Sequence, residues 1–245
     1  MKKVKKNVSQ FNSDVEKLGS YSYTTDRLSS NVANARISSE IASIYDFKDK
    51  VVLDIGCGDG SYTLEFPRLG IKKIIGVDPA SEAISIANKK CGKYNLESIV
   101  NFHEGNIYDL DNVLSMYKFD CIVVRGVLHH LPNAEKAFEE LKKFPGDIII
   151  LEPNGNNFIL KLIELFSSYH RAHEERSFSS SLLRKWIKRN KFTVKKYRFF
   201  NIVPFFCPDL FVKFLTFVEP VVEKISFMRF FFCGQVIFLI KNEQD

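Results

Sequence analysis

Three glycines alternate with other residues in a turn from Gly56 to Gly60, directly after a short apolar segment. That segment, Val51–Ile55, has the composition of a strand buried on both faces of a parallel sheet. Glycine permits positive φ and lets a backbone come close to a ligand. Two carboxylates accompany the turn, Asp54 before it and Asp59 within it, and they would repel a pyrophosphate but suit an ammonium group. The stretch therefore predicts a binding turn for a ligand that carries positive charge.

The elements around this turn follow the order of an open α/β sheet. Apolar residues at helical spacing occupy 61–69, so strand, glycine turn and helix form a corner of the kind that binds nucleotides at the carboxyl ends of strands. The same alternation of strand and helix recurs along the chain. Further strands are predicted at 74–77, within 98–110, at 119–124, within 147–157, and at 192–200 and 234–242. Further helices are predicted at 81–90, 134–144 and 158–166.

The glycine spacing G-x-G-x-G, with an acid two residues before it, resembles the first motif of the class I S-adenosylmethionine-dependent methyltransferases. The resemblance covers about 50–155, with five strand–helix units in order, and extends to the C-terminal third only in outline. It implies an α/β fold: a doubly wound, mostly parallel, seven-stranded Rossmann-like sheet, with an antiparallel C-terminal edge strand and a helical substrate-side insertion. It also implies S-adenosylmethionine as the cofactor and methyl transfer as the activity.

The resemblance assigns the cofactor to positions after the first strands. Asp78 ends the second strand and would accept hydrogen bonds from both ribose hydroxyls, although a helix-capping role is the alternative. Asn106 stands where family members usually have an acid beside the adenine amine, and its amide carbonyl can accept the same bond. Ile107 would flank the ring. The predicted cofactor-binding residues are Asp54, Gly56, Cys57, Gly58, Asp78, Asn106, Ile107 and Arg125.

The acceptor is indicated by the segment V-L-H-H-L at 127–131, which is similar to small-molecule and lipid methyltransferases. The sequence lacks Asn/Asp-Pro-Pro-Tyr and Pro-Cys, the motifs for methylation of nucleobases. We therefore expect a small-molecule, sugar or lipid-linked acceptor, methylated on oxygen. The alternatives are an RNA or protein methyltransferase, or a non-catalytic cofactor-binding module of the same fold.

Histidine is the natural base for a hydroxyl acceptor near neutral pH. The candidates for a base or an acceptor contact are His129, in the turn after the fourth strand, and His170 and His173, in a polar cluster at 169–176. His129 could instead orient its loop, and the cluster could be a solvated helix face. A metal site there is disfavoured because the order H-E-x-x-H is absent, and no metal is predicted.

Four further residues are predicted to contact the acceptor. Glu152 and Asn154 follow the fifth strand at the carboxyl edge of the sheet, although Asn154 could belong only to a turn. Tyr21 and Arg171 complete the set, with ordinary packing as the alternative. The predicted organisation is an N-terminal helical cap at 1–45 and a Rossmann-like domain at 46–245, with substrate-side insertions at about 155–190 and 203–230.

Composition further limits the classes of protein to which this chain could belong. A formal net charge of +6 over 245 residues is too weak to indicate nucleic acid, which is disfavoured as a partner. Five irregularly spaced cysteines without C-x-x-C indicate reduced thiols.

The basic N-terminus precedes no apolar run, so a cytoplasmic protein is predicted, with peripheral membrane contact as an alternative. Eleven of the 23 phenylalanines fall between 199 and 232, which is expected to be core, a dimer surface or a lipid tunnel.

Overall fold

The computed structural model describes residues 27–166 and 176–243. Four predicted site residues lie outside these ranges: Tyr21, His170, Arg171 and His173.

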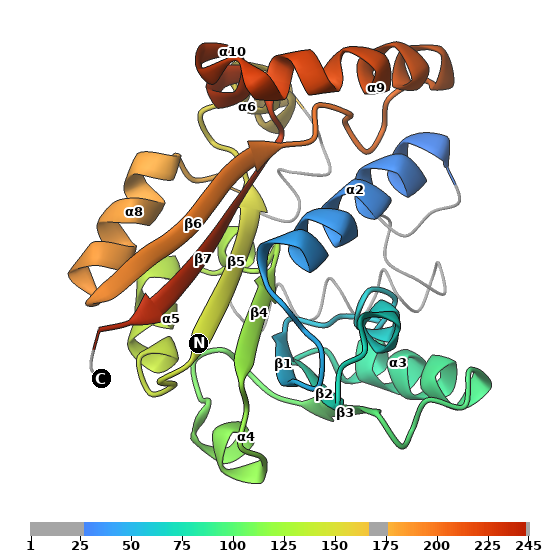
Figure 1. Ribbon diagram of the computed structural model, residues 1–245, viewed down its shortest axis with the longest axis vertical. Coiled ribbons are helices and arrows are strands. Elements are labelled where there is room, and N and C mark those ends of the chain that lie inside the picture. The colour runs from blue at the N-terminus through green and yellow to red at the C-terminus, as the bar shows by residue number, and fades with distance from the viewer. Residues whose placement is uncertain (1–26, 167–175, 244–245) are drawn as a thin grey trace.

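A seven-stranded sheet forms the centre of the molecule (Figure 1). Its strands lie in the order β3-β2-β1-β4-β5-β7-β6, and β7 runs in the direction opposite to the other six strands. This confirms the predicted α/β fold with a mostly parallel seven-stranded sheet. The strands are β1 (Val51–Ile55), β2 (Lys73–Asp78), β3 (Val100–Glu104), β4 (Cys121–Arg125), β5 (Asp147–Pro153), β6 (Phe192–Phe200) and β7 (Gln235–Asn242).

The antiparallel strand differs from the prediction in its position. The sequence predicts β7 at the edge of the sheet, whereas β7 lies between β5 and β6, and β6 forms the edge. The reason is burial. Nearly every residue of β7 is buried, whereas the middle of β6, around Lys195 and Lys196, is exposed to solvent. A strand that is apolar on both faces belongs inside a sheet, and a strand with charged residues can form its edge.

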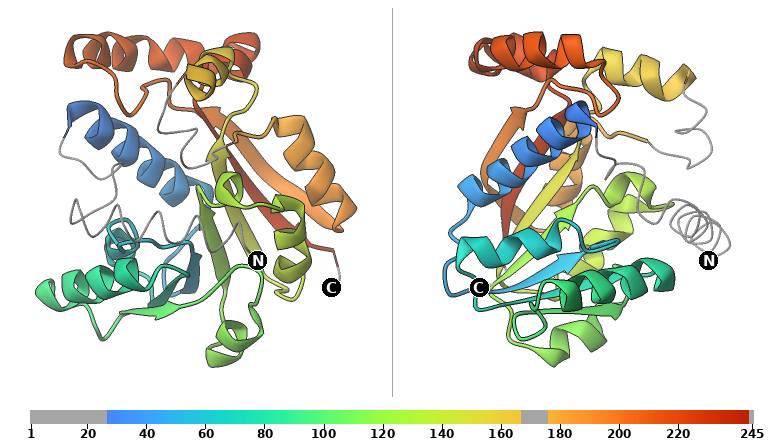
Figure 2. Two further views of the ribbon diagram at one scale, coloured as in Figure 1. Left: turned by 180° about the vertical axis from the view of Figure 1, so that it is seen from behind. Right: turned by 90° about the vertical axis from the view of Figure 1, so that its right-hand side faces the viewer.

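Helices cover both faces of the sheet (Figure 2). The predicted helix at 61–69 is a 3-10 helix, η2, and it contains Pro67, which lacks the N–H donor of an α-helical turn. The helical elements are α2 (Leu28–Ile44), η2 (Thr63–Leu69), α3 (Ser81–Lys93), α4 (Asp111–Met116), η3 (Leu128–His130), α5 (Ala134–Leu141), α6 (Phe158–Phe166), α8 (Ser180–Arg189), α9 (Asp209–Lys224) and α10 (Ser226–Phe232).

Each face of the sheet has its own apolar core. Successive residues of β1 point to opposite faces, so Leu53 packs with α5 and α8, whereas Val52 packs with α2 and α3. On the first face Trp186 of α8 lies in edge contact with Phe178 and tilted against Phe138 of α5. Helix α8 falls within the predicted insertion at 155–190, and it packs into this core, whereas α6 stands apart from the core.

Three helices gather at one end of the molecule. Figures 1 and 2 show α6, α9 and α10 together beyond the carboxyl ends of β4 and β5, with α2 lying beside them. Helix α10 contacts both α9 and α6. This end lies next to the turns that follow the parallel strands, where an open α/β sheet binds its ligands.

Candidate functional site

A cavity of about 480 Å³ lies at the carboxyl ends of the parallel strands. The turns after β1, β2, β3 and β4 form one side of it, and α2, α6 and α9 contribute to the other. All eight residues predicted to bind the cofactor line this cavity: Asp54, Gly56, Cys57, Gly58, Asp78, Asn106, Ile107 and Arg125. The structure therefore brings together residues that are up to 71 positions apart in the chain, from Asp54 to Arg125.

The glycine turn after β1 packs too tightly for side chains. Gly56 has a φ of +76°, and a Cβ atom there would lie 2.3 Å from Cγ2 of Val127. The backbone N–H groups of Gly56 and Cys57 donate to the carbonyl oxygen of Val77, at 2.8 and 3.1 Å. This fixes the turn against β2 and leaves a bare backbone surface at the cavity, which fits close approach by a ligand.

Asp78 is held in place at the end of β2. Its Oδ2 accepts from the N–H of Gly58 at 3.0 Å, and its Oδ1 accepts from the N–H of Ala80 at 2.9 Å. The bond to Ala80 closes a turn before α3 and does not cap the helix, whose N-cap is Ala80 itself, and the Asp78 carboxyl group also lines the cavity. Burial raises the pKa of Asp78 to about 6, with the two backbone donors opposing this rise and Asp54 and Asp59 adding to it.

The two acids beside the glycine turn, Asp54 and Asp59, differ in their surroundings. Asp54 is buried, accepts a hydrogen bond from the hydroxyl of Thr63, and has a pKa raised by burial to about 6. Asp59 is bound by Lys90, whose Nζ lies 2.8 Å from its Oδ2. The sequence predicts two acids acting together on a cationic ligand. The lysine offsets the charge of Asp59, so Asp54 and Asp78 carry the negative charge at this end of the cavity.

Asn106 and Arg125 line the cavity through groups that are already hydrogen-bonded. Oδ1 of Asn106 accepts from the N–H of Tyr108 at 3.0 Å, and a carbonyl oxygen has a second lone pair for a ligand. Arg125 donates to Oγ of Ser38 and to Oδ1 of Asn34, both on α2 and both at 3.1 Å. The guanidinium of Arg125 also lies 3.7 Å from the ring centre of Tyr62.

Arg125 therefore fastens α2 over the glycine turn. Burial lowers the pKa of Arg125, and the hydroxyl of Tyr62 and nearby carboxylates oppose this. Sequence reasoning missed Tyr62 and the residues of α2 that line the cavity, Asn34 and Ile37. The signal for Tyr62 was available, since it lies two residues after Gly60, the last glycine of the predicted binding turn.

His129 and Glu152 form a buried pair beside the cavity. Nδ1 of His129 lies 2.8 Å from Oε2 of Glu152, which is fully buried. The same carboxylate accepts from the backbone N–H groups of Val127 and Leu128 at 2.9 and 2.7 Å, and of His129 itself at 3.2 Å. Where Glu152 accepts at this contact, Nδ1 of His129 carries the proton and Nε2 is the unprotonated ring nitrogen.

Two of the predicted acceptor contacts lie elsewhere. Neither Glu152 nor Asn154 is among the described residues that line the cavity. All four hydrogen bonds of Glu152 are to residues 127–129, so its carboxylate holds that turn in place. Asn154 donates through Nδ2 to the carbonyl oxygens of Phe230 and Cys233, at 2.9 Å each, and so ties β5 to the end of α10. Both residues are therefore positioning groups, because their polar atoms are directed into the protein.

The wall opposite the glycine turn is apolar. Its residues come from α6, α9, the loop before α9 and the end of α10. The sequence draws attention to the phenylalanine-rich segment but does not indicate which of its members face the cavity. The apolar side chains of this wall include Ile159, Leu160, Ile163, Phe205, Phe206, Leu215 and Phe232.

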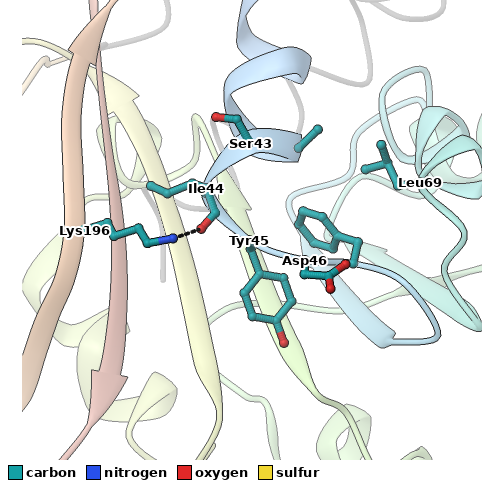
Figure 3. Close-up of a pocket in the computed structure, with 8 residues that line it drawn as sticks. Ser43, Ile44, Tyr45, Asp46, Leu69 and Lys196 are labelled. Atoms are coloured by element: carbon teal, nitrogen blue, oxygen red, sulfur yellow. Dashed lines mark hydrogen bonds between the residues drawn. The ribbon is translucent and has the colours of Figure 1, made fainter.

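A second hollow, of about 420 Å³, lies at the C-terminal end of α2 (Figure 3). Its polar lining includes Ser43, Asp46 and Lys196, and Nζ of Lys196 donates to the carbonyl oxygen of Ile44 at 3.3 Å. This hollow has no histidine and no glycine turn among its lining residues, so the cavity at the strand ends is the better candidate site. Within residues 27–166 and 176–243, no group of three or more His, Cys, Asp or Glu side chains could hold a metal ion.

Comparison with known proteins identifies relatives of this site and fold. A family model described as a methyltransferase domain matches residues 46–195. The chain is 28% identical over 153 residues to the mitochondrial ubiquinone biosynthesis O-methyltransferase of Dictyostelium discoideum, covering 60% of this chain and 45% of that protein. It is 29% identical over 153 residues to the tRNA U34 carboxymethyltransferase of Campylobacter fetus, covering 60% of this chain and 52% of that protein. The chain thus spans about half the length of these relatives.

A solved structure shares the fold. The magnesium protoporphyrin IX methyltransferase ChlM from Synechocystis PCC 6803, solved with bound SAH (S-adenosylhomocysteine), superposes with a TM-score of 0.57 at 15% identity. The match covers 87% of this chain and 83% of that one. The predicted class I Rossmann-like methyltransferase fold is confirmed by the family match and by such structures.

Proposed function

This chain belongs to the methyltransferase-domain family, and from that premise we propose that it transfers a methyl group from S-adenosylmethionine to a hydroxyl oxygen of a small-molecule, sugar or lipid-linked acceptor. The family uses S-adenosylmethionine. The residues present fit that ligand: a bare glycine turn, a carboxylate at the end of β2 for ribose hydroxyls, and Asp54 near a sulfonium or ammonium group.

The pairing of His129 with Glu152 is the observation that carries the choice of a hydroxyl acceptor. A hydroxyl benefits from a base that removes its proton during attack, whereas a carboxylate or phosphate oxygen needs none. The buried carboxylate fixes the tautomer of the imidazole and favours the imidazolium that forms after proton transfer. His129 lines the same cavity as the predicted cofactor residues.

The chemistry divides between cofactor and protein. S-adenosylmethionine supplies an activated methyl group, whose carbon–sulfur bond breaks as the carbon–oxygen bond forms, leaving a neutral thioether. Nε2 of His129 takes the hydroxyl proton, and Glu152 holds the ring in position. The glycine turn and α2 would hold the cofactor beside the acceptor, and their packing would exclude water.

The apolar wall supports an acceptor with a hydrophobic part. It lies across the cavity from Asp54 and Asp78, and comprises aliphatic and aromatic side chains from α6, α9 and α10. Small-molecule sites generally combine such a wall with a few polar groups that fix orientation. The tRNA-modifying relatives make RNA the competing acceptor, and the experiment must distinguish the two.

The first test is fractionation of labelled products. Full-length protein is incubated with methyl-labelled S-adenosylmethionine and extract from the source cells, and the products are separated into organic-soluble, small polar, RNA and protein fractions. We expect label in the organic-soluble or small polar fraction. Label that follows RNA, and that ribonuclease releases, would replace our choice of acceptor with the competing one.

The second test is replacement of the base. We expect His129→Gln to lower turnover by about 100-fold or more without weakening cofactor binding, since it removes proton transfer alone. Glu152→Gln should also lower turnover and shift the pH profile. His103→Gln, in β3 and outside the cavity lining, is the matched control. Full turnover in His129→Gln would show that the acceptor needs no base from this residue.

A further inference from the structure

Helix α9 presents its apolar side to solvent. Four large side chains recur at intervals of four, three and four residues, which places them on one face of the helix. Each side chain is more than half exposed, and the two most exposed, Leu210 and Phe217, are 80% and 82% exposed. The four residues are Leu210, Phe214, Phe217 and Val221. Such a contiguous apolar face on a soluble domain marks an interaction site.

Two acids of the same helix point inward, on the side where Val212 and Val222 are buried. Glu219 and Glu223 bind Arg36 of α2, with Oε1 of Glu219 lying 3.0 Å from Nε and Oε2 of Glu223 lying 2.8 Å from Nη2. The inward side of α9 is therefore mixed, with two buried valines and two ion-paired acids. These ion pairs fix the orientation of α9, because turning the helix over would break them.

Helix α6 extends the apolar surface. Five of its nine residues are large, apolar and at least 44% exposed, and its two charged residues, Lys161 and Glu164, pair with each other at 3.0 Å. Helix α10 contacts both α6 and α9, and the three helices occupy one end of the molecule (Figure 2). The exposed residues of α6 are Phe158, Ile159, Leu162, Leu165 and Phe166. We call the exposed faces of α6 and α9 the apolar end.

Lysines border this surface. Lys213 and Lys224 are exposed and lie eleven residues apart, so they share one flank of the α9 face. The exposed acid of α9 is Asp209, in its first turn, while Glu219 and Glu223 are turned inward. Lysines beside an exposed phenylalanine face are the pattern of a helix that lies in a membrane interface, where the chains reach anionic head groups.

We infer that the apolar end seats the protein on the surface of an anionic lipid bilayer. A second copy of the chain, placed face to face, would bring its own lysines to the same flank, whereas an anionic bilayer supplies the opposite charge. Among residues 27–166 and 176–243, no helix is long and apolar enough to cross a membrane.

The apolar end is continuous with the cavity. Ile159 of α6 and Phe206, before α9, are each nearly half exposed and also line the cavity. A bilayer against this end would therefore border the acceptor wall. Seating on the bilayer is independent of the proposed chemistry, and binding to vesicles can be measured without any methyl transfer.

The test is sedimentation of full-length protein with vesicles. We expect binding to vesicles of phosphatidylcholine with about one third phosphatidylglycerol, and much weaker binding to phosphatidylcholine alone. The double substitution Phe214→Glu/Phe217→Glu should lower partitioning about tenfold or more, and Lys213→Gln/Lys224→Gln should lower it on anionic vesicles only. Tyr94→Glu, an exposed aromatic just after α3, is the matched control and should bind normally.

Each variant is first checked for an unchanged melting temperature and unchanged binding of S-adenosylhomocysteine, so that a folding defect is not read as lost docking. Unchanged vesicle binding by Phe214→Glu/Phe217→Glu would overturn the inference. Absence of vesicle binding by the unaltered protein, together with a dimer that this double substitution dissociates in sedimentation velocity, would assign the apolar end to a second copy instead.

Discussion

At the scale of single residues, the carboxyl group of Asp78 links ligand binding to pH. Burial raises its pKa to about 6, and only the ionised form can accept from both ribose hydroxyls. Affinity for S-adenosylhomocysteine should therefore rise as pH increases from 5 to 7.5, by up to about tenfold per pH unit below 6. Titration calorimetry at several pH values across this range measures the change in affinity.

Asp78→Ala should weaken that binding by about 1.5–3 kcal/mol at pH 7.5, the value of a charged hydrogen bond lost. Asp78→Asn should flatten the pH dependence, leaving the smaller part that comes from Asp54, whose pKa is also raised to about 6. A pH profile that is the same in Asp78→Asn and in the unaltered protein would assign the titration to another group.

The same group affects the stability of the ligand-free protein with the opposite sign. The pKa of Asp78 is higher in the folded protein than its ordinary value of 3.8, so the folded state binds more protons between pH 4 and 6. Unfolding free energy should fall as pH rises through that window, by at most about 3 kcal/mol from this residue. Urea unfolding of ligand-free protein at pH 4.5 and pH 7 measures the fall, which Asp78→Asn should reduce. An unchanged fall in that variant would contradict the assignment.

The sequence indicates which residues line the cavity but not what holds them. The positions of Asp54 and Asp78 follow from strand ends and spacing, and both line the cavity. The pairings of Lys90 with Asp59 and of Glu152 with His129 span 31 and 23 residues, and depend on how separate loops meet. A single sequence contains no signal for such distances, so Glu152 reads as an acceptor contact until its partners are seen.

At the scale of elements, one arginine joins two helices that cover the cavity. Arg36 of α2 binds Glu219 and Glu223 of α9, and these acids also accept from the backbone of Ile202 and Asn201. Arg36→Met would leave two carboxylates without their cation. We expect a loss of about 1–3 kcal/mol in unfolding free energy, and weaker cofactor binding because α2 lines the cavity.

Urea unfolding and calorimetry with S-adenosylhomocysteine measure both effects. Arg189→Met is the matched control, because the pair of Arg189 with Glu135 is largely exposed and should contribute less than about 1 kcal/mol. Adding Glu219→Gln and Glu223→Gln to Arg36→Met should restore part of the stability, since these two positions then carry no unpaired charge, and Glu40 keeps its pair with Arg198. Equal losses from Arg36→Met and Arg189→Met would show that the clamp adds nothing beyond a surface pair.

Periodicity predicted these elements better than their orientations. The bounds of α6 and β6 agree with the apolar pattern, because each segment has a clear period and a clear end. The orientation of α9 was beyond its pattern. Periodicity does not show that Glu219 and Glu223 turn inward beside Val212 and Val222, because their partner Arg36 lies 183 residues away from Glu219.

At the scale of the whole molecule, the two halves of the cavity come from distant parts of the chain. The cofactor half belongs to the first five strands, and the apolar half belongs to α6, α9 and α10, with α2 fastened to both. A ligand that fills the cofactor half should therefore stabilise the entire fold and not one loop. This distinguishes a built site from an adventitious hollow.

We expect S-adenosylhomocysteine at 100 times its dissociation constant to add about 2.7 kcal/mol to the unfolding free energy. For a domain of this size that corresponds to a rise in melting temperature of about 5–10 °C. NAD⁺ is the control, because the carboxylate of Asp54 lies two residues before the glycine turn and would repel its pyrophosphate, and it should give no shift. Scanning calorimetry measures both. A rise in melting temperature with NAD⁺ as large as that with S-adenosylhomocysteine would mean that the turn binds dinucleotides. If neither compound raises the melting temperature at millimolar concentration, the cavity has no basis as a site for a methyl donor.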